Sequence, residues 1–128
     1  MIELMPFAVS MGIRLVEASP QRVVAEMTAR DDLCTAGAIL HGGAVMAFAD
    51  SVAAVGAMLN LPEGAATTTL ESKTNFTGAV RAGDTARAVA EPVHIGRATM
   101  VWQTRIFRGD GKLAAQVTQT QMTLGARA

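Results

Sequence analysis

The sequence predicts an α+β protein in which one long helix lies lengthwise in a strongly curved antiparallel sheet of about six strands. Only one window, from about residue 39 to 61, has the composition and spacing of a long helix. The segments before and after it alternate polar and apolar residues with period 2, which is typical of half-buried strands. An antiparallel sheet normally needs cover on one face, and a single central helix supplies that cover economically.

Each element follows from its local pattern. Before the long helix we expect a short helical turn and two strands, over residues 6–11, 13–18 and 22–29. After it we expect four strands in a meander, over residues 67–76, 84–91, 98–107 and 112–124. The last two strands are joined by the hairpin-type turn 108–111, which contains two glycines.

The long helix is apolar nearly all round. Valine, leucine and phenylalanine spread over most of its circumference and alanine fills the gaps, so we expect it to be buried on most sides. Asn60, Pro62 and Gly64 provide the signals that end it.

Length and composition restrict the class of protein. The chain has 128 residues, enough for one core, and we treat residues 1–128 as a single domain. Half of the residues are hydrophobic and eleven basic residues balance eleven acidic ones. This composition excludes a disordered chain, and it disfavours nucleic-acid binding, which needs an excess of Lys and Arg.

The cysteine content and the absence of a targeting signal suggest a compartment. Cys34 is the only cysteine, which excludes an internal disulfide and a cysteine-rich zinc site. The start of the chain lacks the basic region of a secretory signal, and His41, two glycines and Asp50 interrupt the longest apolar stretch. We therefore expect a soluble cytoplasmic protein without membrane contact.

The segment from His41 to Asp50 carries the strongest chemical signal. Gly42 and Gly43 at the head of a helix are costly, by roughly 1 kcal/mol each relative to Ala, unless a ligand must approach the backbone closely. A helix N-terminus offers unpaired N–H groups and the positive end of the helix dipole. This arrangement suits a polarised carbonyl oxygen, as in an oxyanion hole.

Asp50 is the only charged residue in a stretch of thirty residues. A buried carboxylate without partners is expensive, so this side chain should face a cleft, a partner chain or a hydrogen-bond donor. Gly42 and Asp50 lie about 12 Å apart along the helix axis and cannot act on one substrate atom within one chain. If both serve one site, a second subunit must supply one of them, which predicts a two-fold symmetric dimer.

These residues resemble a known family. His-Gly-Gly followed by an acid nine residues after the His, inside an Ala-rich helix, is similar to the hotdog-fold acyl-CoA thioesterases. The resemblance is greatest to the PaaI-like group, which contains phenylacetate-degradation and 4-hydroxybenzoyl-CoA thioesterases. It extends over residues 12–124 and includes the segment 69–76 and later turns at 83–84, 96–97 and 109–113.

The resemblance implies a hotdog fold and the hydrolysis of an acyl-CoA thioester to a free acid and CoA. The Gly42 N–H would polarise the thioester carbonyl, and Asp50 of the opposing subunit would act as nucleophile or general base. The residues implied in substrate binding are His41, Gly43, Thr35, Thr69, Phe76, Arg81, Gly96 and Arg97. Among these, Thr69 would help to hold the hydrolytic water, Arg81 and Arg97 would contact CoA phosphates, and His41 would position the loop.

The same resemblance implies a homodimer, which commonly pairs into a dimer of dimers, and CoA enters only as part of the substrate. Hydrolysis needs no metal or redox cofactor. Two departures from the family pattern are visible: Thr35 stands where relatives often carry Asn or Gln, and residues 77–79 replace a common Arg-Pro.

Other functions remain open at this point. One is a non-catalytic acyl-CoA-binding or sensing protein that has kept the fold, which the Thr35 departure favours. A second is a Cys34–His41 nucleophile, although no third orienting residue is evident. A third is a hydratase, but neither Asp31 nor Asp32 is followed five residues later by the His of that class.

Overall fold

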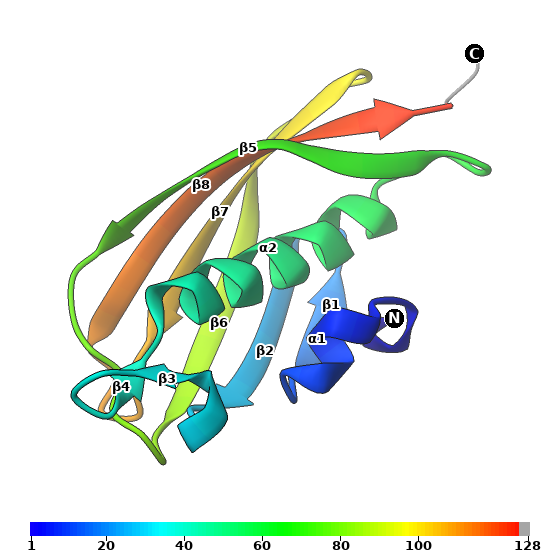
Figure 1. The fold of residues 1–128 in the computed structure, drawn as a ribbon. Helices are drawn as coiled ribbons and strands as arrows, with labels where there is room; N and C mark the ends of the chain where they lie inside the picture. The colour runs from blue at the N-terminus through cyan, green and yellow to red at the C-terminus, as the bar shows by residue number, and fades with distance from the viewer. Residues whose placement is uncertain (126–128) are drawn as a thin grey trace.

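The computed structural model describes residues 1–125 as one six-stranded antiparallel sheet with a long helix along its concave face (Figure 1). The helices are η1 (Ile2–Leu4), α1 (Pro6–Ser10), η2 (Asp31–Leu33) and α2 (Gly42–Leu59). The strands are β1 (Arg14–Ser19), β2 (Arg22–Thr28), β3 (Cys34–Thr35), β4 (Ile39–Leu40), β5 (Ala66–Phe76), β6 (Thr85–Ile95), β7 (Thr99–Phe107) and β8 (Leu113–Leu124). The predicted fold class and the six main strands are therefore confirmed.

The strand order β1-β2-β6-β7-β8-β5 corrects the predicted meander of four strands. Only β6, β7 and β8 form a meander. β5 follows α2 in sequence but pairs with β8 at the far edge of the sheet, while β6 pairs with β2. Period 2 shows which residues form a strand and which face they occupy, but it carries no information about which strand lies beside which.

The short elements around the helix start were not predicted. β3 and β4, of two residues each, pair as a short hairpin, and η2 is a single turn of 3-10 helix. Elements of two or three residues are too short to show a period, so no sequence pattern predicts them. The longer turn between β7 and β8 forms as predicted, with Gly111 at a positive φ of 84° and the Gly111 N–H donating to the Arg108 carbonyl.

The core lies between α2 and the sheet. Its largest fully buried side chain is Trp102 on β7, which packs directly beneath Gly56 of α2. Phe48, Val52 and Val55 fill the rest of the same helix face. Gly56 allows the indole ring to approach the helix more closely than any residue with a Cβ would permit.

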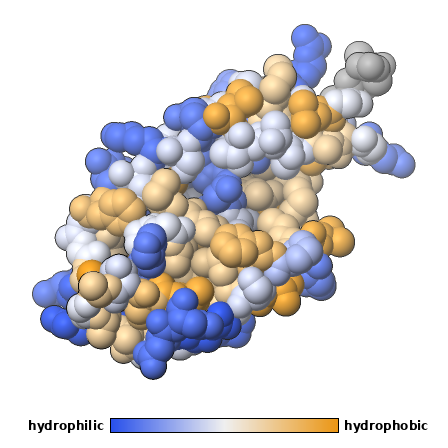
Figure 2. Space-filling view, in the orientation of Figure 1, coloured by the Kyte–Doolittle hydropathy of each residue, from blue (hydrophilic) through white to orange (hydrophobic). Residues whose placement is uncertain are grey.

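The opposite side of α2 is less covered than the sequence predicts. Only eight of its 18 residues are buried, and Met46 is 39% exposed. In Figure 2, which has the same orientation as Figure 1, hydrophobic residues gather on the face that carries the helices and hydrophilic ones lie toward the rims. The helix is long and apolar enough to cross a membrane by composition, but here it is the core helix of its own sheet. α2 is less buried than the sequence predicts because one sheet can wrap only one side of a helix.

Candidate active site

The start of α2 is capped by His41. Its ring Nδ1 accepts a hydrogen bond from the Gly43 N–H at 2.8 Å, and the N–H groups of Ala44 and Val45 donate to the His41 carbonyl. The first four N–H groups of a helix lack ordinary intrahelical partners, and three of them are satisfied here: those of Gly43 and Ala44 by His41, and that of His41 by the Leu33 carbonyl at 2.9 Å. The Gly42 N–H has no acceptor among residues 1–125. It is therefore the free donor at the positive end of the helix dipole.

An aromatic ring stands beside this donor. Phe76, the last residue of β5, is 54% exposed, and its ring tip would lie 3.3 Å from a Cβ placed on Gly42. The strand that leaves the far end of α2 thus returns to the helix start (Figure 1). Phe76 and Gly42 together form one wall of the candidate substrate site.

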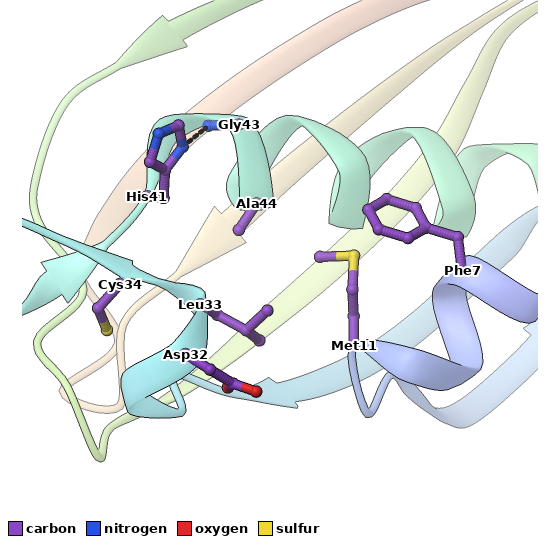
Figure 3. Close-up of a pocket in the computed structure, with 8 residues that line it drawn as sticks. All are labelled: Phe7, Met11, Asp32, Leu33, Cys34, His41, Gly43 and Ala44. Carbon is purple, nitrogen blue, oxygen red and sulfur yellow. Dashed lines mark hydrogen bonds between the residues drawn. The ribbon is translucent and has the colours of Figure 1, made fainter.

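A pocket of about 220 Å³ opens on the other side of the helix start (Figure 3). It is lined by Phe7, Met11, Asp32, Leu33, Cys34, His41, Gly43 and Ala44. The Cys34 thiol donates to the Arg30 carbonyl at 3.3 Å, and the His41 Nδ1 atom accepts from Gly43. These two side chains are hydrogen-bonded elsewhere rather than to each other, which argues against the Cys–His nucleophile.

Asp50 lies on α2, eight residues after Gly42, and is half-buried. Its Oδ1 atom accepts from the Thr69 hydroxyl at 2.7 Å and from the Gln119 Nε2 amide at 2.9 Å. No donor among residues 1–125 reaches Oδ2, and this atom is not among their buried polar atoms without a partner. One carboxylate oxygen is thus anchored to the sheet, and the other is open to solvent.

A β-bulge sits at this point of β5. The register with β8 shifts between Thr69 and Glu71, which leaves Leu70 unpaired and 54% exposed. The less exposed positions of β5 change from odd to even numbers across the bulge, so Thr69 and Ser72 both face the helix. The bulge thereby directs the Thr69 hydroxyl at Asp50.

The structure separates the predicted site residues into groups within one chain. Thr35 pairs with Ile39 beside the helix start, in the same region as His41, Gly42 and Phe76. Asp50 and Thr69 form a second group about 12 Å further along the helix axis. Gly42 and Asp50 are therefore not brought together in one chain, as their spacing predicts.

The two arginines are further apart. Arg81 precedes β6 and Arg97 follows it, so an 11-residue strand of roughly 33 Å separates them. Arg81 lines a second pocket, of about 460 Å³, with Ala79, Asp84, Arg108 and Asp110. Within it, the Arg108 guanidinium beside Asp110 lowers the pKa of that carboxyl to about 2. Arg81 makes no ion pair with residues 1–125, and so it is the cation of this pocket that is free to bind an anion.

Gly96 lies in the turn before β7, beside Arg97. A Cβ on Gly96 would lie 2.8 Å from the Thr99 carbonyl oxygen, so the turn itself requires glycine. This structural requirement explains Gly96 without a substrate.

Sequence reasoning missed the two fully buried glutamines of β8, Gln119 and Gln121. They occupy inward positions of a strand in which the outward positions are also polar. Because both faces of residues 118–121 look hydrophilic, the alternation gave no signal that these two amides lie inside. Only a polar residue at an inward position of the neighbouring strand, Thr69, hints at a buried polar group there.

Comparison with known proteins identifies the family. Residues 37–115, which include α2 and most of the sheet, match the model of the thioesterase superfamily. The chain belongs to this superfamily. The predicted resemblance is thus confirmed, and the protein is a thioester hydrolase.

Individual relatives agree with this assignment. The thioesterase is 39% identical to ComA2 of Bacillus subtilis, named as a candidate esterase, over 77% of this chain and 78% of that protein. It is 28% identical to the 1,4-dihydroxy-2-naphthoyl-CoA hydrolase of Listeria monocytogenes, over 81% of this chain and 84% of that protein. The PaaI protein of the E. coli phenylacetic acid degradation operon has the same fold, with a TM-score of 0.88 at 24% identity, over 97% of this chain and 88% of that one.

Proposed function

We propose that this thioesterase hydrolyses acyl-CoA esters at a site shared by two copies of the chain. The observation that carries the proposal is the free Gly42 N–H at the start of α2, beside the exposed ring of Phe76. A thioester carbonyl placed there would accept this hydrogen bond and gain from the helix dipole as negative charge develops on its oxygen. Because the His41 ring accepts from Gly43, the cap leaves the Gly42 N–H free for substrate.

Asp50 of the second copy drives the attack. Its Oδ2 atom, without a donor among residues 1–125, is available either to bond to the carbonyl carbon or to take a proton from water. In the first route the carboxylate bonds to the carbonyl carbon and the C–S bond breaks, so a mixed anhydride forms and CoA leaves as a thiolate that takes a proton from water; water then attacks the Asp50 carboxyl carbon and releases the acid. In the second route water attacks directly. Single-turnover hydrolysis in heavy-oxygen water separates the two routes, since only the anhydride route puts label into Asp50.

Two features of the chain support a dimer. β5 is an 11-residue strand at the sheet edge, with β8 on one side and no strand on the other among residues 1–125. Such an edge is a template for pairing with another chain. α2 lies over this edge region of the sheet, and its apolar side that faces away from the sheet is uncovered. Asp50 on this helix is hydrogen-bonded to β5 through Thr69. A copy that docks on this edge would cover α2 and bring its own helix start toward Asp50. Further pairing into a dimer of dimers, and location in the cytoplasm, remain predictions.

The remaining site residues have supporting roles in this scheme. Thr69 helps to hold the water, Phe76 and Gly43 line the carbonyl site, and Thr35 lies behind the helix start. Arg81 binds a CoA phosphate, and Arg97, with Gly96 in its turn, reaches the same CoA only from the other copy, because β6 separates the two arginines. Main-chain amide, carboxylate and water supply the chemistry, so the scheme requires no metal or redox cofactor.

The Gly42 amide can be tested with two variants at one position. Gly42 is the first helical residue, and the extended backbone of His41 (φ −61°, ψ 137°) suits a following proline. Gly42→Pro removes the N–H, whereas the matched control Gly42→Ala keeps it and adds a similar Cβ. We expect Gly42→Pro to lower kcat by about 10²- to 10³-fold relative to Gly42→Ala on a panel of aryl- and fatty-acyl-CoA esters. Equal activity of the two variants would remove the amide from the mechanism.

Sharing of the site between copies has a separate test. Gly42→Pro and Asp50→Asn are each expected to be inactive. Co-expression in equal amounts produces mixed dimers that have one intact site and one doubly altered site, so about a quarter of the wild-type activity should return. If Gly42 and Asp50 acted within one chain, the mixture would stay inactive.

A further inference from the structure

Two glutamines on β8 lie completely inside the protein next to Asp50. Gln119 is 0% exposed and Gln121 is 1% exposed, and with Thr104 they are the buried polar residues of an otherwise apolar core. Their amides contact each other, since Gln119 Nε2 donates to Gln121 Oε1 at 2.8 Å. The Gln121 amide also donates to the Thr67 hydroxyl at 3.1 Å.

These side chains close a ring of hydrogen bonds around one carboxylate oxygen. Gln119 Nε2 donates to Asp50 Oδ1 at 2.9 Å, and the Thr69 hydroxyl lies 2.7 Å from Oδ1 and 2.6 Å from Gln121 Oε1. The two amides and the hydroxyl thus connect Asp50 to β5 and β8 at once. The Thr69 hydroxyl has one hydrogen and lies within hydrogen-bond distance of two acceptors, Asp50 Oδ1 and Gln121 Oε1. When Asp50 loses its negative charge during the reaction, the hydroxyl can donate to Gln121 instead.

This arrangement leaves buried polar atoms without partners. Among residues 1–125, Gln119 Oε1 has none, and neither do Ser72 Oγ and Trp102 Nε1, which belong to the two residues that flank Gln119 in the sheet. An apolar residue at position 119 would avoid the cost of an unpaired buried carbonyl. The glutamine instead directs its amide at Asp50. A costly polar group is commonly found where function requires it.

We propose that Gln119 and Gln121 are positioning residues of the reaction, which fix Asp50 Oδ1 and the Thr69 hydroxyl so that Oδ2 is the oxygen presented to substrate or water. This inference rests on the proposed role of Asp50. Gln119 acts directly on the carboxylate, and Gln121 acts through Gln119 and Thr69. Neither residue touches the substrate.

The test replaces each amide by a side chain of the same length. Gln119→Met removes the donor to Asp50 and to Gln121 together with the unpaired carbonyl, so the two effects on stability oppose each other and the variant should still fold, with a Tm close to that of the wild type. We expect its kcat to fall by about 10- to 100-fold, because a small displacement of a reacting group is enough for such a loss, while KM stays within twofold. Gln121→Met should lower kcat less. The matched control is Gln116→Met, on the outward face of the same strand, which should leave kcat unchanged.

A second background separates positioning from general packing. In Asp50→Asn, the residual single-turnover rate should be the same with and without Gln119→Met, because Gln119 acts only through the carboxylate. Equal losses in both backgrounds, or a Gln119→Met enzyme within twofold of wild-type kcat, would overturn the proposal. Full activity of Asp50→Asn itself would refute the proposed function and, with it, this inference. An inactive Asp50→Asn beside a fully active Gln119→Met refutes the positioning role alone.

Discussion

The contact between Gly56 and Trp102 provides a test of the core packing that holds α2 on the sheet. A Cβ on Gly56 would lie 2.3, 2.5 and 2.8 Å from three carbons at the far end of the indole ring. Carbon atoms pack at about 3.5–4.0 Å, so the helix or the ring must move by more than 1 Å. Trp102 is 0% exposed, so its ring is enclosed by other atoms of the core.

The expected net effect of Gly56→Ala follows from two opposing contributions. Overpacking of a well-filled core costs typically 1–3 kcal/mol, and a larger movement costs more. Alanine recovers about 1 kcal/mol of helix propensity relative to glycine. With an overlap this severe we expect a net destabilisation of about 2 kcal/mol, which for a chain of this size is a decrease in Tm of roughly 5–10 °C. Urea unfolding at fixed protein concentration should show a lower midpoint with an unchanged m value.

A second substitution, at Trp102, should reverse the sign of the stability change that Gly56→Ala causes. Trp102→Leu removes the ring atoms that a Cβ at Gly56 would meet, and by itself it should cost about 2–4 kcal/mol through the cavity that it leaves. In the Trp102→Leu background, Gly56→Ala should become stabilising by up to about 1 kcal/mol. A Gly56→Ala protein as stable as wild type, or one that destabilises both backgrounds equally, would refute the packing argument.

Three further predictions concern single contacts. His41→Ala should lower the free energy of unfolding by about 1 kcal/mol, since the Gly43 N–H loses its acceptor, while His41→Asn should retain most of the cap; urea midpoints measure both. Thr69→Val should lower kcat without lowering Tm, because it removes a donor to Asp50, and steady-state kinetics with a thermal scan would detect it. Arg108 lowers the pKa of Asp110 from its ordinary value of 3.8 to about 2, so its stabilising effect is present above pH 3.8 and is lost as the pH falls through 2. Asp110→Asn should therefore be less stable than wild type at pH 5, and the difference should shrink as the pH falls through 2, as measured by denaturant midpoints; a difference that is as large at pH 2 as at pH 5 would contradict this assignment.

The amino-acid pattern alone was sufficient for the elements and for part of the site. Alternation with period 2 and one apolar window depend on local residue order, so the six main strands and α2 were predicted within a few residues. The segment from His41 to Asp50 could also be recognised as a candidate site from its local sequence. Two glycines at a helix start and an isolated acid are unusual wherever they occur, and the helix rise then set the distance between Gly42 and Asp50.

Other features depended on contacts between residues far apart in the chain. The pairing of β5 with β8 brings Thr69 beside Gln121, 52 residues away, and Gln119 reaches Asp50 across 69 residues. No local pattern distinguishes these glutamines from their outward neighbours, because a polar strand looks the same on both faces until the helix covers one of them. Local order thus determined which elements form, whereas the packing of α2 against the sheet decided which side chains hold Asp50, because hydrogen bonds of this kind form only after distant strands have come together.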